Sequence, residues 1–445
     1  MKATGLILLL AAILAPLYWF VPMLATHSTE AVISQYIGCA ALIAMGMTQL
    51  MATRFRWLEL LFGSLDRIYV IHKWTGIGAI IAVLLHDTLD AEVKGLGGET
   101  ALTDLAETMG EFSYYGLLVL VGITIATFIP YHWWRWTHKF MGAFFALGAF
   151  HYVFMLKPFS VWDPLGLYVS AFCALGILCY LYTLLPFGFL HGRFGYRINE
   201  IKQSGDALAV SLEPEKSGLS HRAGQFAFIR FENQGKSEVH PFTISKAPDA
   251  SKSLRFTIKP LGDDTRHFAS KLKAGDQASV SPAFGHFSRT NGKRPEIWLA
   301  GGVGVTPFAA FAQTVTQDSA PVHFFYCTPN RRRASHVEEF EALAKTNSNF
   351  HFHLIETESQ GRLNADKIEA ALDFPISKAT AFFCGPEAMR ESLKSGLRSK
   401  GLAARRFKYE EFEIRSGIGL EPIFKILLKL IGAAFDRYQT SRQTR

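Results

Sequence analysis

Cysteine is scarce in this chain of 445 residues, and the few cysteines stand far apart. They are Cys39, Cys173, Cys179, Cys327 and Cys384. No two form a C-x-x-C pair, so the sequence predicts neither a disulfide framework nor a plant-type iron–sulfur motif. Any electron relay on this chain must therefore work without an iron–sulfur cluster.

Several common functional signatures are also absent from the sequence. The net charge is +8, but no arginine-rich helix or RNA-binding aromatic motif accompanies it. No EF-hand loop, kinase signature or helix-turn-helix pattern is present either. We expect no nucleic-acid partner and no obligatory protein partner, and we attribute the positive charge to membrane orientation and contact with anionic lipid.

Apolar residues are abundant and crowd into the first 190 positions. Six stretches are long enough to span a bilayer: 4–25, 31–52, 68–89, 110–130, 137–156 and 162–185. The first is too long for a signal peptide and has Trp19 and Phe20 where small residues should precede cleavage. The sequence therefore predicts a six-helix membrane domain.

Charges in the predicted loops indicate the orientation. Basic residues lie between helices two and three, between four and five, and after six: Arg54, Arg56, Arg67, Arg135, Lys139, Arg193 and Arg197. The opposite loops hold Glu30 and the acidic segment 87–111, with Lys94 and Lys157 as exceptions. The positive-inside rule then places both termini in the cytoplasm. We expect an integral protein of a bacterial inner membrane.

Four histidines lie in two of these stretches: His72 and His86 in the third, His138 and His151 in the fifth. A rise of 1.5 Å per residue separates the members of each pair by about 20 Å along the helix. Buried imidazoles in lipid need ligands or hydrogen bonds. Pairing His72 with His138 and His86 with His151 would ligate two stacked haems.

The spacing of the second pair differs from that of the first. Fourteen steps leave His72 and His86 about 40° apart around the helix, but thirteen leave His138 and His151 about 140° apart. The second helix then needs a bulge or local unwinding, or the haems are approached from different sides. Histidines held only by helix–helix hydrogen bonds are the alternative.

The pattern changes to short alternating runs at about residue 195, which predicts a small antiparallel barrel. After 295, apolar strands alternate with helical stretches, as in a parallel nucleotide-binding sheet. We expect a helical membrane domain at 1–190, a barrel at 191–290 and an α/β domain at 291–412. The extension 413–445 contains an apolar run with Lys425 and Lys429, either an amphipathic helix on the inner leaflet or a segment packed on the sheet.

Four motifs follow one another in the soluble part: HPFTIS (240–245), AGGVGVTPF (300–308), FFCGP (382–386) and FKYEEF (407–412). In this order, behind six helices with H-x13-H and H-x12-H, they resemble the NADPH oxidase and ferric reductase family over residues 30–412. The resemblance implies a ferredoxin-reductase-like cytoplasmic module that binds FAD and NAD(P)H. It also implies two b-type haems in the membrane domain.

The resemblance carries over to individual residues at the flavin site. Phe242 should pack on the flavin ring, Thr243 should offer a hydroxyl near its reactive edge, and His240 stands where soluble relatives have an arginine aimed at the FAD phosphates. The implied FAD-binding residues are His240, Pro241, Phe242, Thr243, Ser245, Gly262, Thr265 and Gly285.

The nicotinamide nucleotide site is implied in the same way. Its residues are Gly301, Gly302, Gly304, Thr306 and Pro307 at the pyrophosphate and Cys384, Gly385 and Pro386 near the nicotinamide. Arg331 and Arg332, beside Arg333, are placed to clasp a 2′-phosphate, which favours NADPH over NADH, although plain surface charge is the alternative. Phe412 matches the aromatic that covers the flavin. We expect Phe412, Cys384 and Thr243 to act in catalysis.

These inferences predict an NAD(P)H-dependent oxidoreductase that sends electrons through FAD and two haems to an acceptor outside, either oxygen or a ferric chelate. A proton-relay transporter with a nucleotide-sensing domain is an alternative use of the membrane histidines. A flavin reductase that feeds a partner protein or quinone is another.

Overall fold

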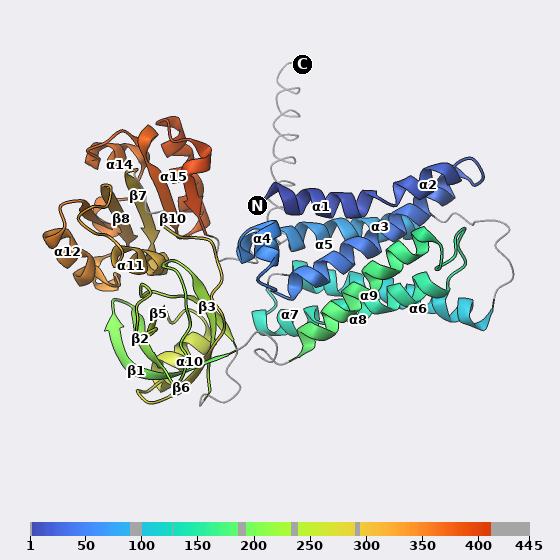
Figure 1. The fold of residues 1–445 in the computed structure, drawn as a ribbon, viewed down its shortest axis with the longest axis horizontal. Coiled ribbons are helices and arrows are strands. Elements are labelled where there is room, and N and C mark those ends of the chain that lie inside the picture. The colour runs from blue at the N-terminus through green and yellow to red at the C-terminus, as the bar shows by residue number, and fades with distance from the viewer. Residues whose placement is uncertain are drawn as a thin grey trace, which may run out of the picture. The chain divides into compact units, whose positions relative to one another are not determined.

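The computed structural model describes residues 2–89, 100–126, 128–185, 193–232, 239–289 and 294–410. The chain forms two compact units that divide between Leu185 and Pro186, one helical and one built on two sheets (Figure 1). The predicted domain boundaries at 190, 290 and 412, and the extension 413–445, lie outside the described residues.

All strands of the described residues lie in the second unit, and the regular structure described in the first unit is helical. Its helices are α1 (Ala3–Leu14), α2 (Leu17–Met23), α3 (Thr29–Ala52), α4 (Leu58–Phe62), α5 (Leu65–Thr88), α6 (Ala101–Ile125), α7 (Tyr131–His138), α8 (Met141–Phe154) and α9 (Pro164–Leu184). Helix α3 is the most deeply buried of the candidate spans. The other spans expose large apolar side chains such as Ile7, Val119 and Leu178, as helices that face lipid do.

The structure has five helices long and apolar enough to cross a membrane within the described residues: 3–23, 29–52, 65–88, 101–125 and 164–184. The predicted stretch 137–156 is not a single span, because α7 ends at His138 and α8 begins at Met141. This interruption lies within the helix for which the spacing of His138 and His151 predicted a bulge or local unwinding.

Helix α6 also differs from the prediction, because it begins at Ala101 rather than at 110. Thr100 accepts a hydrogen bond from the Thr103 N–H, and the Thr103 side chain accepts one from the Thr100 N–H. This reciprocal cap starts the helix inside the acidic segment that was predicted as a loop. Residues 90–99 of that segment lie outside the described residues.

The second unit begins with an antiparallel sheet. Its strands are β1 (Phe194–Ser204), β2 (Ala207–Pro214), β3 (Phe226–Phe231), β4 (His240–Thr243), β5 (Leu254–Ile258) and β6 (Gln277–Val280), with helix α10 (Asp263–Lys271) before β6. The strand order is β4-β3-β6-β1-β2-β5. A bridge between Ile244 and Phe256 joins the end strands, so the sheet closes into the predicted barrel.

A parallel sheet follows, with β7 (Glu296–Gly301), β8 (Val322–Thr328), β9 (Phe350–Glu356), β10 (Thr380–Cys384) and β11 (Phe407–Tyr409). Every residue of β7 and β8 is buried, which explains their largely apolar sequences. The helices around it are α11 (Thr306–Ala312), α12 (Val337–Thr346), α13 (Thr357–Gln360), α14 (Ala365–Ala371) and α15 (Glu387–Ser399), with short 3-10 turns at 302–305, 331–333, 376–378 and 404–406. The predicted fold class, helical membrane domain plus ferredoxin-reductase-like module, is confirmed.

The strand order of this sheet is β11-β10-β7-β8-β9. The chain winds from β7 outward to β9, then returns across β7 to form β10 and β11. The direction of winding therefore reverses between β7 and β10. In open parallel sheets, ligands bind outside the carboxyl ends of the strands at such a switch point.

Candidate functional site

The two turns at the switch point contact each other closely. A Cβ on Gly304 would lie 2.3 Å from the Cys384 carbonyl oxygen, and one on Gly301 would lie 2.7 Å from Cδ of Pro386. Such distances are shorter than any side chain tolerates, so the turn after β7 requires glycine at both positions. The predicted pyrophosphate and nicotinamide segments are thus brought together at one edge of the sheet.

Helix α11 begins directly behind the first of these turns. Gly302 has φ +56°, a left-handed conformation that glycine adopts without strain. Pro307 occupies the start of α11, where a missing N–H costs nothing because the first turn has no intrahelical acceptor. Thr306 is buried beside it. The turn therefore presents backbone N–H groups at a helix N-terminus, an arrangement that binds phosphate.

Cys384 ends β10 and is fully buried. Burial raises the pKa of its thiol well above the usual value, and the neighbouring Glu410 raises it further. Glu410 is itself buried, and a Cβ on Gly285 would lie 3.1 Å from its Oε1. One carboxylate therefore lies close to both the turn after β6 and the end of β10.

Sequence reasoning missed Glu410. The stretch FKYEEF was singled out for its aromatic residue, whereas the structure puts the acidic residue directly after β11 next to Cys384. An acidic residue that follows a parallel strand was the available signal. Phe412, predicted to cover the flavin, lies outside the described residues.

The flavin motif begins on β4, which pairs with β3 so that Thr243 lies opposite Phe226. Phe242 is half-buried and stacks on His240, with ring centroids 5.9 Å apart. The His240 ring in turn meets Phe268 of α10 edge-on at 5.4 Å. The predicted flavin contacts of β4 are therefore packed against α10.

The N-terminus of α10 is capped by a side chain that was predicted to bind FAD. Thr265 Oγ1 accepts hydrogen bonds from the N–H groups of Gly262 (2.9 Å) and Leu261 (3.0 Å). Gly262 and Thr265 thus form the N-terminus of the helix that His240 contacts further along, at Phe268.

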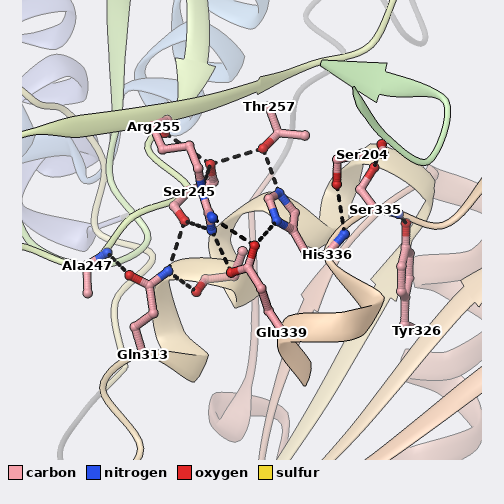
Figure 2. A network of polar contacts seen from close by, with 11 residues as sticks. Ser204, Ser245, Ala247, Arg255, Thr257, Gln313, Tyr326, Ser335, His336 and Glu339 are labelled. Atoms are coloured by element: carbon pink, nitrogen blue, oxygen red, sulfur yellow. Dashed lines mark hydrogen bonds and ion pairs between the residues drawn. The ribbon is translucent and has the colours of Figure 1, made fainter. Parts of the chain in front are cut away.

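Ser245 lies elsewhere, in a polar network between the barrel and α12 (Figure 2). It is fully buried, and its hydroxyl and its N–H both donate to the Arg255 carbonyl oxygen, at 3.0 and 2.7 Å. Thr257 Oγ1 donates to the Ser245 hydroxyl at 3.0 Å. These bonds engage the side chain of Ser245 within the protein.

The centre of this network is Glu339 of α12. Arg255 donates to both of its carboxylate oxygens, at 2.7 and 2.9 Å. His336 bonds Glu339 through Nδ1 (2.7 Å) and Thr257 through Nε2 (2.8 Å). Burial alone would raise the pKa of Glu339, but the hydrogen bonds from His336 and Arg255 outweigh it and lower that pKa to about 2.

The arginines predicted to bind a 2′-phosphate border a groove of about 950 Å³. Arg331 donates to both carboxylate oxygens of Glu341, at 2.7 and 2.8 Å, so its guanidinium group is already paired with a carboxylate. Arg332 lines the groove beside Glu338 and Glu356. Of the two arginines predicted to clasp the phosphate, Arg332 is the better placed.

In the helical unit, three of the four histidines predicted to ligate haem have Nδ1 bonded to a backbone carbonyl. The Nδ1–H of His72 donates to Thr48 (3.0 Å), that of His86 to Ser34 (2.9 Å) and that of His151 to Ala106 (2.9 Å). A neutral imidazole with its proton on Nδ1 keeps its lone pair on Nε2. This orientation is typical of histidines that ligate a metal through Nε2.

The predicted pairs also lie near each other. The rings of His72 and His138 are 6.3 Å apart, centroid to centroid, so the two side chains lie near enough that both could bind one haem iron. His86 is near enough to His151 for the two rings to interact electrostatically. Nδ1 of His138 is buried with no hydrogen-bond partner among the described residues.

A glycine lies against each histidine of the second pair, His86 and His151. A Cβ on Gly38 would lie 3.1 Å from Nδ1 of His86, and one on Gly110 would lie 2.5 Å from Nδ1 of His151. Helices α3 and α6 therefore approach these imidazoles as closely as a backbone can. The ring spacing of the first pair, and the carbonyl acceptors and glycines at the second, are compatible with the predicted role of these histidines as haem ligands.

Three protein-family models match the chain in succession. The ferric reductase like transmembrane component matches residues 37–149, which include His72, His86 and His138. The FAD-binding domain matches residues 195–306, and the oxidoreductase NAD-binding domain matches residues 298–395. The predicted resemblance to the ferric reductase and NADPH oxidase family is thereby confirmed. The chain carries the domains of a membrane-bound NAD(P)H-dependent oxidoreductase.

Among curated relatives, the chain is 24% identical to a flavohemoprotein from Pseudomonas putida, over 44% of this chain and 52% of that one. It is 26% identical to a flavohemoprotein from Xylella fastidiosa, over 51% of this chain and 60% of that one. The chain thus spans between half and two thirds of the length of these relatives.

Solved structures of similar proteins include the FAD/NAD-binding domain of a nitric oxide dioxygenase from Vibrio cholerae, with 21% identity, a TM-score of 0.44, and coverage of 49% of this chain and 98% of that one. A flavohemoglobin from Malassezia yamatoensis with bound FAD and heme has 17% identity and a TM-score of 0.47, and covers 87% of this chain and 97% of that one. Likeness at this level supports no conclusion about the site.

Proposed function

We propose that this protein carries electrons from cytoplasmic NADPH, or NADH, through FAD and two b-type haems to a small-molecule acceptor on the outer side of the membrane, either a ferric chelate or oxygen. The observation that carries the proposal is the orientation of the membrane histidines. Three of them turn Nε2 away from a backbone carbonyl that holds Nδ1, and the predicted partners lie close together.

Bound FAD would supply hydride acceptance and single-electron release, and haem would supply onward transfer of single electrons. The chain's own contribution is orientation. The glycines of the β7 and β10 turns let the nucleotide approach the backbone, while the protonated thiol of Cys384 and the carboxylate of Glu410 border that position. Phe242 and Thr243 are proposed to hold the flavin ring, and the start of α10 its phosphates.

In the membrane unit, α5 holds His72 and His86 and the α7–α8 pair holds His138 and His151. The interruption between His138 and Met141 supports ligation by both members of the second pair, because it allows their angular offset to differ from that of a regular helix. The loop charges support an inner position for His72 and His138, which places His86 and His151 toward the outer acceptor.

The test is the visible absorption spectrum of the detergent-purified protein before and after anaerobic addition of NADPH. We expect a b-type haem Soret band that shifts on reduction. His86→Ala and His151→Ala should each lower the haem content, whereas His132→Ala, which removes an exposed histidine of α7, should not. Protein that contains flavin but no haem after haem-supplemented expression would contradict the proposal and favour a proton relay.

The acceptor is identified by the same preparation with intact haem. Ferric-chelate reduction and superoxide formation are measured separately, with superoxide dismutase added to the first assay. Chelate reduction that persists in the presence of the dismutase indicates a ferric reductase. If neither acceptor is reduced while NADPH still reduces the haem, a protein or quinone partner receives the electrons.

A further inference from the structure

A group of imidazoles lies on one face of the parallel sheet, near the amino ends of two strands. His323 of β8 pairs in register with His351 of β9, and His353 lies two residues further along β9. Residues two apart in a strand point to the same face, so His351 and His353 share a face with the ring of His323. The His323 centroid is 4.4 Å from that of His351 and 5.3 Å from that of His353.

A carboxylate completes this group from the chain that follows α14. His323 Nε2 lies 3.1 Å from Asp373 Oδ1, and His323 Nδ1 lies 3.1 Å from His353 Nε2. His323, His351 and Asp373 can each direct one ligand atom so that all three atoms lie within 4.8 Å of one another. His323 is buried, whereas the Asp373 side chain is 58% exposed, which leaves a path for an ion from solvent.

The group is distinct from the nucleotide site. Parallel strands present their carboxyl ends at one edge, where the turns after β7 and β10 lie. His323 is the second residue of β8 and His351 the second of β9, so both stand near the opposite, amino edge of the sheet. None of the residues assigned to FAD, nicotinamide or haem belongs to this group.

We propose that His323, His351 and Asp373 form a binding site for one divalent transition-metal ion of the zinc type, with His353 orienting His323 from behind. Two imidazoles and one carboxylate are ligands that zinc accepts, and three protein ligands leave a fourth position for water. Cross-strand histidines suit this role because their outer nitrogens converge above the same face of the sheet.

The protonation states are compatible with such a site. Burial, together with the neighbouring His351, lowers the pKa of His323, and burial lowers the pKa of His353 to about 4. Because metal binds the neutral form of imidazole, the lowered pKa of His323 is compatible with its proposed role as a ligand.

Without metal, the Asp373 carboxylate accepts the Nε2 proton of His323, whose Nδ1 then accepts from His353 Nε2. Binding through Nε2 requires that His323 move this proton to Nδ1 and that His353 change tautomer in turn. No net proton is released by these two residues, and His323 then donates to His353 in the way that neighbouring groups fix metal-bound histidines.

The competing explanation is a packed ladder of rings. His353 stacks on Phe325 at 4.5 Å with an interplanar angle of 13°, and His323 meets Phe374 edge-on. Such a ladder would stabilise the sheet by cross-strand packing alone. It uses the ring faces and predicts no dependence on the ring nitrogens or on Asp373.

The experiment is equilibrium dialysis of the full-length, chelator-treated protein against micromolar Zn²⁺, with zinc per chain measured by elemental analysis. Because His323 is buried, the variants are chosen at the rim: His351→Gln and Asp373→Asn. Each is expected to bind one zinc ion fewer per chain than the wild type. Flavin content, measured on the same samples, reports folding, and if His351→Gln fails to fold, the exposed position Asp373→Asn decides.

Two further variants separate the site from its alternatives. His267→Ala removes an exposed histidine of α10 and should bind as much zinc as the wild type. His353→Phe keeps the ring on Phe325 but should weaken zinc binding by about 10-fold to 100-fold. The proposal is overturned if Asp373→Asn binds as much zinc as the wild type, or if His267→Ala loses as much as the rim variants.

Discussion

Gly110→Ala tests the assignment of His151 with a single methyl group. The new Cβ would lie 2.5 Å from Nδ1 of His151 and 3.0 Å from its Cε1 and Cγ. The imidazole cannot keep this position, and its 2.9 Å hydrogen bond to the Ala106 carbonyl is lost or bent. Overpacking of this kind costs about 1 to 3 kcal/mol, and loss of a hydrogen bond adds about 1 kcal/mol.

Because the displaced ring is proposed to ligate the outer haem, we expect Gly110→Ala to lower the haem content from about two per chain toward about one. The control is Gly122→Ala on the same helix, whose Cβ would meet nothing within 4 Å. Both changes gain the same helix propensity, about 1 kcal/mol, so their difference isolates the contact with His151. The assay is the pyridine haemochrome ratio of haem to protein. Equal haem content in the two variants would refute the assignment.

Three other outcomes are expected. Gly304→Ala, whose Cβ would lie 2.3 Å from the Cys384 carbonyl, should lower kcat/KM for NADPH by about tenfold or more while flavin content stays unchanged. Arg332→Ala should raise KM for NADPH and not for NADH, with Arg405→Ala as an exposed control; equal effects on both nucleotides would remove Arg332 from phosphate binding. The folded pKa of Glu339 is depressed to about 2, so its stabilisation is present above the unfolded pKa, about 4.5, and is lost as pH falls toward 2. The urea midpoint of Glu339→Gln should therefore lie below that of the wild type at pH 7 and approach it in acid, and a difference that is constant with pH would contradict this.

The apolar stretches predicted the helical unit, but neither they nor the histidine spacing could place the break between α7 and α8. Thirteen steps on a regular helix point His138 and His151 in different directions, and the sequence therefore required an irregularity somewhere between them. Lys139 and Phe140, where the helix is interrupted, are neither proline nor glycine, so no local signal marks the position. Packing decides it.

The start of α6 was also missed, for the opposite reason. Thr100 and Thr103 provide a local signal for a helix cap, but the acidic residues around them were interpreted as a loop. Acidic side chains favour the first turn of a helix through its dipole, and Asp104 occupies that turn. The composition therefore agreed with a helix once the cap was recognised.

The motifs predicted which segments of the chain meet. They did not predict that neighbouring residues within one motif contact different parts of the protein. HPFTIS was treated as a unit at the flavin, whereas the structure turns its residues to different neighbours. Phe242 stacks on His240, Ile244 is buried in the barrel core, and Ser245 bonds to Arg255. A motif read along the chain cannot show this division, because it depends on the bridge between Ile244 and Phe256 that closes the barrel behind Thr243.

The contacts of Ser245 connect the flavin motif to the nucleotide domain. Ser245 lies two residues after Thr243, and the same Arg255 whose carbonyl accepts from Ser245 donates to Glu339 at the first turn of α12. Gln313, just after α11, donates to the Ser245 carbonyl at 3.2 Å and accepts from the Ala247 N–H at 3.1 Å. The segment that is proposed to hold the flavin ring is therefore fixed to both helices that follow the first two strands of the nucleotide sheet. We expect a change in either helix to act on the position of Thr243 through these bonds, because Ser245 is buried and its hydroxyl is already engaged with Arg255 and Thr257.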